Sequence, residues 1–203
     1  LENLVVNNEI NMTRVALYFS DYINGVTLKH RDVSEKMFPE FPIHAITNGV
    51  HSETWTADEF KELFDKHIPN WRNSSLSLRN ALNIPLSEIW SAHQKAKRRL
   101  FDYIYQTEGT KLSSTVFTIG FARRFTKYKR PTLLFSDMEE LLKINDTVGK
   151  IQIVFAGKAH PNDIEGKEMI KEIYEIKKKY GKRIKIVFLE GYDMDLAKLM
   201  VAG

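Results

Sequence analysis

The sequence of 203 residues contains no cysteine, which excludes a disulfide framework and a thiolate metal site. It has no His-Glu-x-x-His motif, and the nearest histidine pair, His44 and His51, suits a polar loop, so we expect no metal. The glycine-rich phosphate-binding motifs of ATPases and dinucleotide-binding proteins are also missing. Its apolar runs are too short to span a membrane, and a secretory signal pattern is absent. We therefore expect a cytoplasmic protein without a membrane partner.

Positive charge is in only small excess. The formal net charge is +4, although 28% of the residues are charged. Such a mild excess does not indicate a nucleic-acid partner, and we expect none. The 43% of hydrophobic residues is enough to build a core, and the length allows one domain or two small ones. The sequence opens without a start signal and stops where an α/β chain would enter another strand. We therefore expect a piece of a larger protein.

The pattern of apolar residues predicts three segments. Residues 1–50 have a mostly helical pattern, and residues 51–113 predict a helical connection. Residues 114–203 alternate strand and helix and predict the first half of a doubly wound α/β domain. The fold class is therefore α/β.

Within the last segment, three near-continuous apolar runs predict parallel strands covered on both faces, at 115–121, 151–156 and 184–190. The segments 131–144 and 163–179 are long enough to be right-handed helical crossovers between them.

The first two segments carry weaker local signals. They predict helices over 12–37 with a break at Asn24–Gly25, a strand at 43–47 closed by an Asn48–Gly49 turn, a helix capped by Thr56 or Asp58 and ending at His67, a loop at 69–83, and a helix over 85–105.

A basic stretch, residues 120–130 (GFARRFTKYKR), follows the first of these strands, and five of its last eight residues are Lys or Arg. Open α/β sheets bind ligands outside the carboxyl ends of their strands. The amides at the start of the helix predicted from Pro131 would add a partial positive charge there, which suits a phosphate. The stretch therefore predicts an anion site, and a solvated basic turn is the alternative on charge alone.

Two further polar loops follow the other strands, Gly157 to Asp163 and Glu190 to Asp193. Parallel strands would bring all three loops to one edge, where Arg124, Lys129 and Lys158 would form a pocket for phosphate groups. The alternative for Lys158 and His160 is a surface loop with a helix cap at Asn162 or Asp163.

Three stretches together resemble the α-glucan phosphorylases, the family of glycogen and maltodextrin phosphorylases. They are residues 46–51 (ITNGVH) with Trp55, residues 120–130, and residues 155–161 (FAGKAHP). The resemblance spans nearly the whole sequence, is most specific at the Arg-Arg-x-x-x-Tyr-Lys-Arg element, and is greatest to the shorter bacterial and archaeal branch. Shorter matches in the same order occur at 11–13 (NMT), 24–26 (NGV) and 190–192 (EGY).

The resemblance implies two Rossmann-like domains facing a cleft, the GT-B arrangement, with only part of each domain in this sequence. Residues 1–50 would end the N-terminal catalytic domain, and residues 51–203 would begin the C-terminal one. The family cleaves α-1,4-glucan from its non-reducing end with inorganic phosphate, giving glucose 1-phosphate with retained configuration. It uses pyridoxal phosphate through its phosphate group and is commonly a homodimer.

The resemblance also implies roles by position. Arg124 and Lys129 match catalytic residues that hold the substrate phosphate. Arg123 matches a basic residue at the cofactor phosphate, and Tyr192 matches an aromatic residue beside the cofactor. Asn48 matches an asparagine that contacts the bound sugar, and Lys158 in the second loop joins it as a substrate-binding residue.

The sequence departs from the family pattern in three ways. The lysine that forms the cofactor Schiff base would lie beyond Gly203, so we expect this segment alone to be inactive. Asp21 stands where larger members often have a histidine near the sugar, and Asp193 stands where they have an arginine.

Two other functions share part of this pattern. A nucleotide-sugar glycosyltransferase of the glycogen-synthase type also places basic residues against phosphates between two Rossmann-like domains. A non-enzymatic regulator that binds carbohydrate or phosphate is the other alternative.

Overall fold

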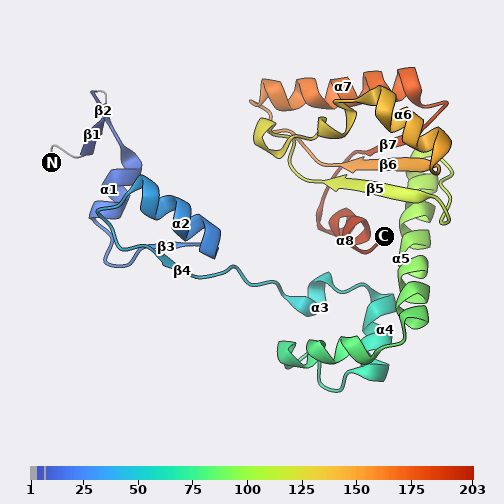
Figure 1. The fold of residues 1–203 in the computed structure, drawn as a ribbon, viewed down its shortest axis with the longest axis horizontal. Coiled ribbons are helices and arrows are strands. Elements are labelled where there is room, and N and C mark those ends of the chain that lie inside the picture. The colour runs from blue at the N-terminus through green and yellow to red at the C-terminus, as the bar shows by residue number, and fades with distance from the viewer. Residues whose placement is uncertain (1–3, 7) are drawn as a thin grey trace. The chain divides into compact units, whose positions relative to one another are not determined.

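The computed structural model describes residues 4–6 and 8–203. Contacts between residues divide the chain into two compact units, Leu1–His51 and Ser52–Gly203. Figure 1 shows the elements of each unit. No helix in the described ranges is long and apolar enough to cross a membrane.

The described residues of the unit Leu1–His51 form two short helices, as predicted, and four two-residue strands. Side chains begin both helices: Asn11 accepts a hydrogen bond from the Arg14 amide, and Thr27 accepts one from the His30 amide. The elements are β1 (Val5–Val6), β2 (Glu9–Ile10), α1 (Met12–Tyr18), β3 (Asn24–Gly25), α2 (Leu28–Met37) and β4 (His44–Ala45).

The predicted helix break at Asn24–Gly25 is confirmed, because α1 ends at Tyr18 and α2 begins at Leu28, whereas the predicted Asn48–Gly49 turn is wrong. Asn24–Gly25 is the strand β3, which pairs in parallel with β4, and neither Gly25 nor Gly49 has the positive φ of an Asn-Gly turn. The Asn48 amide instead donates to the Val26 carbonyl oxygen and continues the pairing of these segments. Tertiary pairing has overridden the local preference.

The second unit begins with a helical hairpin that has a small core of its own. Its centre is Trp71, which is buried and donates its indole N–H to the Asp65 carboxylate at 2.8 Å. Leu63, Ile84 and Ala92 pack in the same cluster. The elements are α3 (Ser52–Trp55), α4 (Asp58–His67), the 3₁₀ segment η2 (Ser75–Asn83) and α5 (Leu86–Glu108).

The hairpin corrects two predictions. The segment 69–83 is largely 3₁₀ helix rather than loop. Neither Thr56 nor Asp58 caps α4, because its first flanking residue is Ala57, and the Thr56 hydroxyl instead donates to the Ser52 carbonyl oxygen.

The rest of the second unit is the predicted parallel α/β layer structure. The strands β5 (Phe117–Ala122), β6 (Ile151–Ala156) and β7 (Lys185–Leu189) pair in parallel in the order β5-β6-β7. The helices α6 (Met138–Thr147) and α7 (Ile164–Tyr180) cover one face, and α5 and α8 (Met194–Ala202) cover the other (Figure 1).

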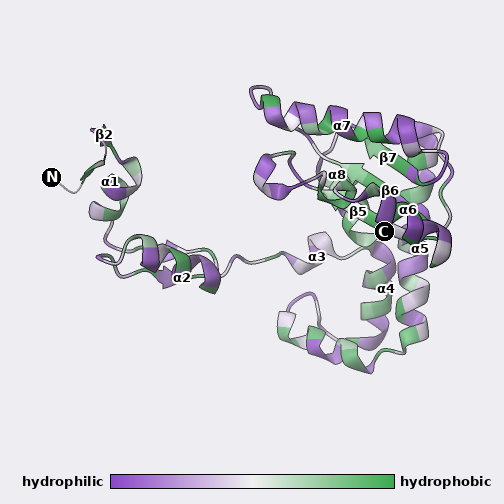
Figure 2. Ribbon diagram, turned by 45° about the horizontal axis from the view of Figure 1, so that its top comes forward, coloured by the Kyte–Doolittle hydropathy of each residue, from purple (hydrophilic) through white to green (hydrophobic). Residues whose placement is uncertain are grey.

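Alternation along β6 divides the core between the two faces. Ile153 and Phe155 pack in the cluster that includes Leu141 of α6, whereas Val154 packs in the cluster that includes Leu100 of α5. Every residue of β6 is buried, and Figure 2 shows the apolar strands between the helical layers. Two-sided burial is therefore the reason that β6 and most of β7 have continuous apolar sequences, whereas the outer strand β5 has no buried residue, so the expected cover on both of its faces is wrong.

Gln152 is the exception on β6, a polar side chain that is 1% exposed. Its Nε2 donates to the Ser113 carbonyl oxygen at 2.8 Å and to the Thr118 hydroxyl at 2.9 Å, and its Oε1 accepts from the Ser113 amide at 3.1 Å. The amide therefore ties the segment before β5 to the central strand.

Lys97 of α5 is also buried. Its ammonium donates to the Val116 carbonyl oxygen at 3.0 Å and lies 5.5 Å from the centroid of the Phe101 ring. Burial lowers the pKa of this lysine from its ordinary value of 10.5.

The first stability prediction concerns Gln152. Gln152→Leu keeps a side chain of similar volume but leaves the Ser113 amide and carbonyl groups without their partner, so we expect a loss of about 3 kcal/mol in the free energy of unfolding. Urea unfolding measures this loss. Gln106→Leu on the exposed face of α5 is the matched control and should change it by less than about 0.5 kcal/mol. An equal effect of the two substitutions would contradict the bonding role of Gln152.

The second stability prediction concerns Lys97. Its pKa is lower in the folded chain than in the unfolded chain, so between these two values the unfolded chain binds more protons and stability rises with pH. In Lys97→Met we expect this alkaline rise to disappear and stability at neutral pH to be equal or higher. Thermal unfolding at several pH values measures it, with the exposed Lys95→Met as control. A variant that keeps the full rise would contradict the assignment.

Candidate functional site

The parallel sheet brings three loops to one edge. Because β5, β6 and β7 run in the same direction, their carboxyl ends lie together, and the segments that follow them are 123–137, 157–163 and 190–193. These segments contain the basic stretch and both polar loops singled out in the sequence. The edge outside them is where open α/β sheets bind their ligands.

Two hydrogen bonds join the first loop to the second. The Arg123 amide donates to the Ala156 carbonyl oxygen at 3.2 Å, and the Phe125 amide donates to that of Lys158 at 3.0 Å. The donors are two residues apart and so are the acceptors, so the bonds continue the spacing of the β5–β6 ladder past the ends of both strands. The exposed Arg124 therefore lies between two residues whose backbone is fixed.

The side chain of Phe125 anchors the first loop in the core. It is 0% exposed, and its ring centroid lies 5.4 Å from that of Phe121 and 5.5 Å from that of Phe188. Its cluster lies on the face covered by α6 and α7. An apolar residue inside a basic stretch thus holds the loop in place while the charged residues around it stay exposed.

The third loop reaches the end of β5 through Tyr192. The Tyr192 hydroxyl donates to the Ala122 carbonyl oxygen at 3.4 Å, and the half-buried ring packs in the cluster of the α5 and α8 face. The next residue, Asp193, caps α8 by accepting from the Leu196 amide at 2.9 Å. Tyr192 therefore lies beside Ala122, the last residue of β5, and Ala122 directly precedes Arg123 in the sequence.

The cations of these loops are largely unpaired. Lys127 lies 3.2 Å from Glu165, and both side chains are exposed. Lys129 is half-buried, and its ammonium nitrogen lies 5.5 Å from the centroid of the Tyr128 ring. Among the described residues of these three loops, four exposed cations have no carboxylate partner: Arg123, Arg124, Arg130 and Lys158. A cluster of unpaired positive charge attracts anions.

The predicted contribution of a helix N-terminus to this site is wrong. Helix α6 begins at Met138 rather than at Pro131, after two short 3₁₀ turns, η3 (Lys127–Lys129) and η4 (Leu133–Phe135). Arg130 has a left-handed φ of 49° and ends η3, and residues 133–135 form η4 instead of the first turn of an α-helix. The Asp137 carboxylate then caps α6 by accepting from the Glu140 amide at 2.9 Å. Positive charge at the edge comes from side chains instead.

The second loop contains the helix cap expected from its sequence, and the phosphate role of Lys158 stays a prediction. Asp163 caps α7 by accepting from the Gly166 amide at 2.8 Å, as expected, and Asn162 does not. The His160 imidazole Nδ1 accepts from the Asn162 amide at 3.2 Å, which gives His160 a local role in the turn. Lys158 is exposed, and its backbone is fixed to Phe125. Of this loop, Lys158 is the side chain that stays available for a ligand.

Asn48 lies in the other unit. Its side chain is exposed, and its amide donates to the Val26 carbonyl oxygen at 3.2 Å. Its contact with a sugar stays a prediction.

Sequence reasoning gave no role to two features of the edge. Glu190, named only as the start of the third loop, accepts a hydrogen bond from the Tyr174 hydroxyl at 3.0 Å, and burial together with this carboxylate raises the pKa of Tyr174 to about 12. The position of Glu190 directly after β7 was a signal that could have suggested a role for it. The Thr126 hydroxyl is buried and has no hydrogen-bond partner among the described residues, and no sequence pattern indicates that.

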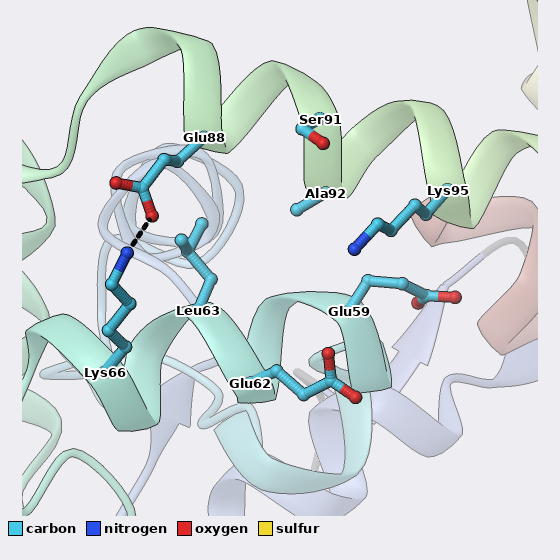
Figure 3. Close-up of a pocket in the computed structure, with 8 residues that line it drawn as sticks. All are labelled: Glu59, Glu62, Leu63, Lys66, Glu88, Ser91, Ala92 and Lys95. Atoms are coloured by element: carbon cyan, nitrogen blue, oxygen red, sulfur yellow. Dashed lines mark hydrogen bonds and ion pairs between the residues drawn. The ribbon is translucent and has the colours of Figure 1, made fainter.

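A separate hollow of about 240 Å³ lies between α4 and α5 (Figure 3). Lys66 and Glu88 face each other across it at 2.8 Å, and Glu59 has one buried oxygen without a partner among the described residues. Its lining carries charges of both signs, so it lacks the one-sided character of the sheet edge. It is lined by Glu59, Glu62, Leu63, Lys66, Glu88, Ser91, Ala92 and Lys95.

Comparison with known proteins agrees with the motifs at this edge. Glycogen phosphorylase of Aquifex aeolicus is 40% identical over 223 aligned residues, which cover 95% of this chain and 32% of that protein. Maltodextrin phosphorylase of Thermococcus litoralis is 36% identical, covering 97% of this chain and 27% of that protein. Glycogen phosphorylase of Mycobacterium tuberculosis is 30% identical over 96% of this chain. The chain thus spans about a third or less of the length of these relatives.

The sequence profile of one family, described as carbohydrate phosphorylase, matches residues 3–203. That range includes all three loops of the sheet edge and Asn48. Because the profile covers almost the entire sequence, the chain belongs to the carbohydrate phosphorylase family.

Proposed function

We propose that this chain is the central part of an α-1,4-glucan phosphorylase. The enzyme would use inorganic phosphate to release glucose 1-phosphate from the non-reducing end of glycogen, starch or maltodextrin, with retained configuration. The observation that carries this proposal is the set of unpaired cations held at the carboxyl edge of a parallel sheet. Family membership and the names of the relatives support the same function.

In this proposal, the two units belong to two Rossmann-like domains that face a cleft. Arg124 and Lys129 hold the substrate phosphate, and Lys158 adds a third cation from the neighbouring loop. An arginine offers two parallel N–H donors to a phosphate, whereas a lysine ammonium adjusts as a point charge. The hydrogen bond from the Phe125 amide to the Lys158 carbonyl oxygen supports this grouping, because it holds the backbones of two of the loops together.

The same edge fits the phosphate of pyridoxal phosphate. Arg123 is an exposed cation without a carboxylate among the described residues, and the Tyr192 ring lies beside the end of β5. We assign Arg123 to the cofactor phosphate and Tyr192 to the cofactor ring. When bound, pyridoxal phosphate would supply a second phosphate that can hold and release a proton. Covalent attachment would need a lysine outside this sequence, so the segment alone would be inactive.

The residues of this chain act on charge and position. Two phosphates placed close together repel each other, so several fixed cations are needed to hold both. In the reaction, the bond from the sugar C1 to the glycosidic oxygen breaks, a bond from C1 to an oxygen of the substrate phosphate forms, and the departing oxygen takes a proton from that phosphate. Arg124 and Lys129 stabilise the phosphate beside the positively charged sugar that develops at C1.

Asn48 would hydrogen-bond the sugar from the other domain. By the same family resemblance, we propose a homodimer in the cytoplasm.

The first activity prediction concerns Lys129. In the full-length protein, Lys129→Ala removes a cation from the substrate phosphate, so we expect phosphate-dependent release of glucose 1-phosphate from maltodextrin to fall by at least about 100-fold. The control is Lys143→Ala on α6, an exposed lysine paired only with Glu140 on the same helix. It should leave the rate unchanged. A folded Lys129→Ala enzyme with most of its activity would remove Lys129 from the site.

The second activity prediction concerns Arg124. Arg124→Lys keeps the charge but loses the two-pronged contact, so we expect the KM for phosphate to rise about tenfold with little change in the KM for maltodextrin. Initial rates at varied phosphate and varied maltodextrin separate the two constants. Arg79→Lys, an exposed arginine in η2, is the matched control. An unchanged phosphate KM in Arg124→Lys would contradict the contact.

A further inference from the structure

A glycine allows the second loop to pass directly beneath the basic loop. Gly157 has a φ of +154°, a conformation that side chains rarely adopt. A Cβ atom at this position would overlap the carbonyl oxygen of Arg123 and would lie 2.8 Å from Cε2 of Phe125. The backbone of Arg123 and the ring of Phe125 therefore pack against Gly157 so closely that no side chain fits there.

A second glycine contacts the same loop from the first turn of α7. A Cβ atom at Gly166 would lie 2.5 Å from the carbonyl oxygen of Phe125 and 3.0 Å from Cβ of Ala159. Gly166 is buried, and it has the ordinary φ of a helix, where alanine is otherwise the more favourable residue. Space rather than backbone conformation requires glycine here.

The two contacts bear on one short segment. Gly157 meets Arg123 and Phe125, and Gly166 meets the Phe125 carbonyl group, while the intervening Arg124 is exposed. The backbone hydrogen bonds of Arg123 to Ala156 and of Phe125 to Lys158 hold the same segment against the end of β6 and the second loop. A methyl group at Gly157 would displace the Arg123 carbonyl group before Arg124, and one at Gly166 would displace the Phe125 carbonyl group after it.

We propose that Gly157 and Gly166 are positioning residues of the anion site, which set Arg124 and Lys158 at the spacing that holds the substrate phosphate. This inference rests on the proposed phosphorolysis and adds two residues to it that do not touch the substrate. A displacement of about 1 Å in a positioned charged group is enough to cost up to 100-fold in rate. Sugar binding, assigned to Asn48 in the other unit, would be affected less.

The test uses Gly157→Ala and Gly166→Ala in the full-length protein. We expect each to raise the KM for phosphate by about tenfold or more while the KM for maltodextrin stays within about twofold. Gly109→Ala is the matched control, because Gly109 also has a positive φ, of 64°, but a Cβ there would meet no atom within 4 Å. It carries the backbone strain without the contact and should leave both constants unchanged. Circular dichroism and thermal unfolding establish that each variant is folded.

The outcomes separate the two proposals. Absence of phosphate-dependent glucose 1-phosphate release by the unmodified full-length protein would overturn the function. An active unmodified protein, combined with a folded Gly166→Ala or Gly157→Ala variant of normal phosphate KM, would overturn the positioning role alone. Equal increases in both KM values, or loss of folding in both variants, would also overturn it, because the glycines would then act through general stability.

Discussion

The parallel hydrogen-bond ladder between β5 and β6 is the constraint on which the rest of the second unit depends. Its register pairs Ala122 with Ala156, so the two strands end side by side and their following loops must leave from the same point. The ladder then continues into those loops through the bonds of Arg123 and Phe125. Core packing determines the strand register, and this register therefore also sets the spacing of the charged residues beyond the strands.

The distribution of negative charge at this edge explains how the cations stay available. Each of the three helices that follow the loops is capped by an aspartate, Asp137 for α6, Asp163 for α7 and Asp193 for α8. Each cap accepts a hydrogen bond from a backbone amide of its own helix, which stabilises that helix by about 1 kcal/mol. These three aspartates in the segments that follow the strands are thus engaged with backbone amides, and helix capping accounts for part of the one-sided charge at the site.

The sequence was enough to predict the parts of the fold that depend on two-sided burial. The apolar run at 151–156 became β6, which is buried between helices on both faces, and the run at 115–121 became the less buried outer strand β5. The helix predicted over 131–144 begins only at Met138, because the residues before it form the 3₁₀ turn η4 with Phe135 buried in the core, and the predicted Asn48–Gly49 turn is replaced by pairing of Asn48 with Val26. These failures share one cause, which is that tertiary contacts decide conformations that local sequence leaves open.

The candidate site also has features that the sequence predicts and features that it does not. The second kind argues against the alternative of a solvated basic turn. Topology alone brings Arg124, Lys158 and Tyr192 to one edge, so their proximity follows from the strand pattern in the sequence. The anchoring does not, because nothing in the sequence indicates that Phe125 is fully buried beneath exposed neighbours. A basic turn that is merely solvated needs no such anchor, since its charges are equally stable in many conformations and ordering them costs conformational entropy. A loop held by two backbone bonds, a buried ring and close glycine contacts has lost that freedom, and a fixed array of like charges is stabilised most by a ligand of opposite charge.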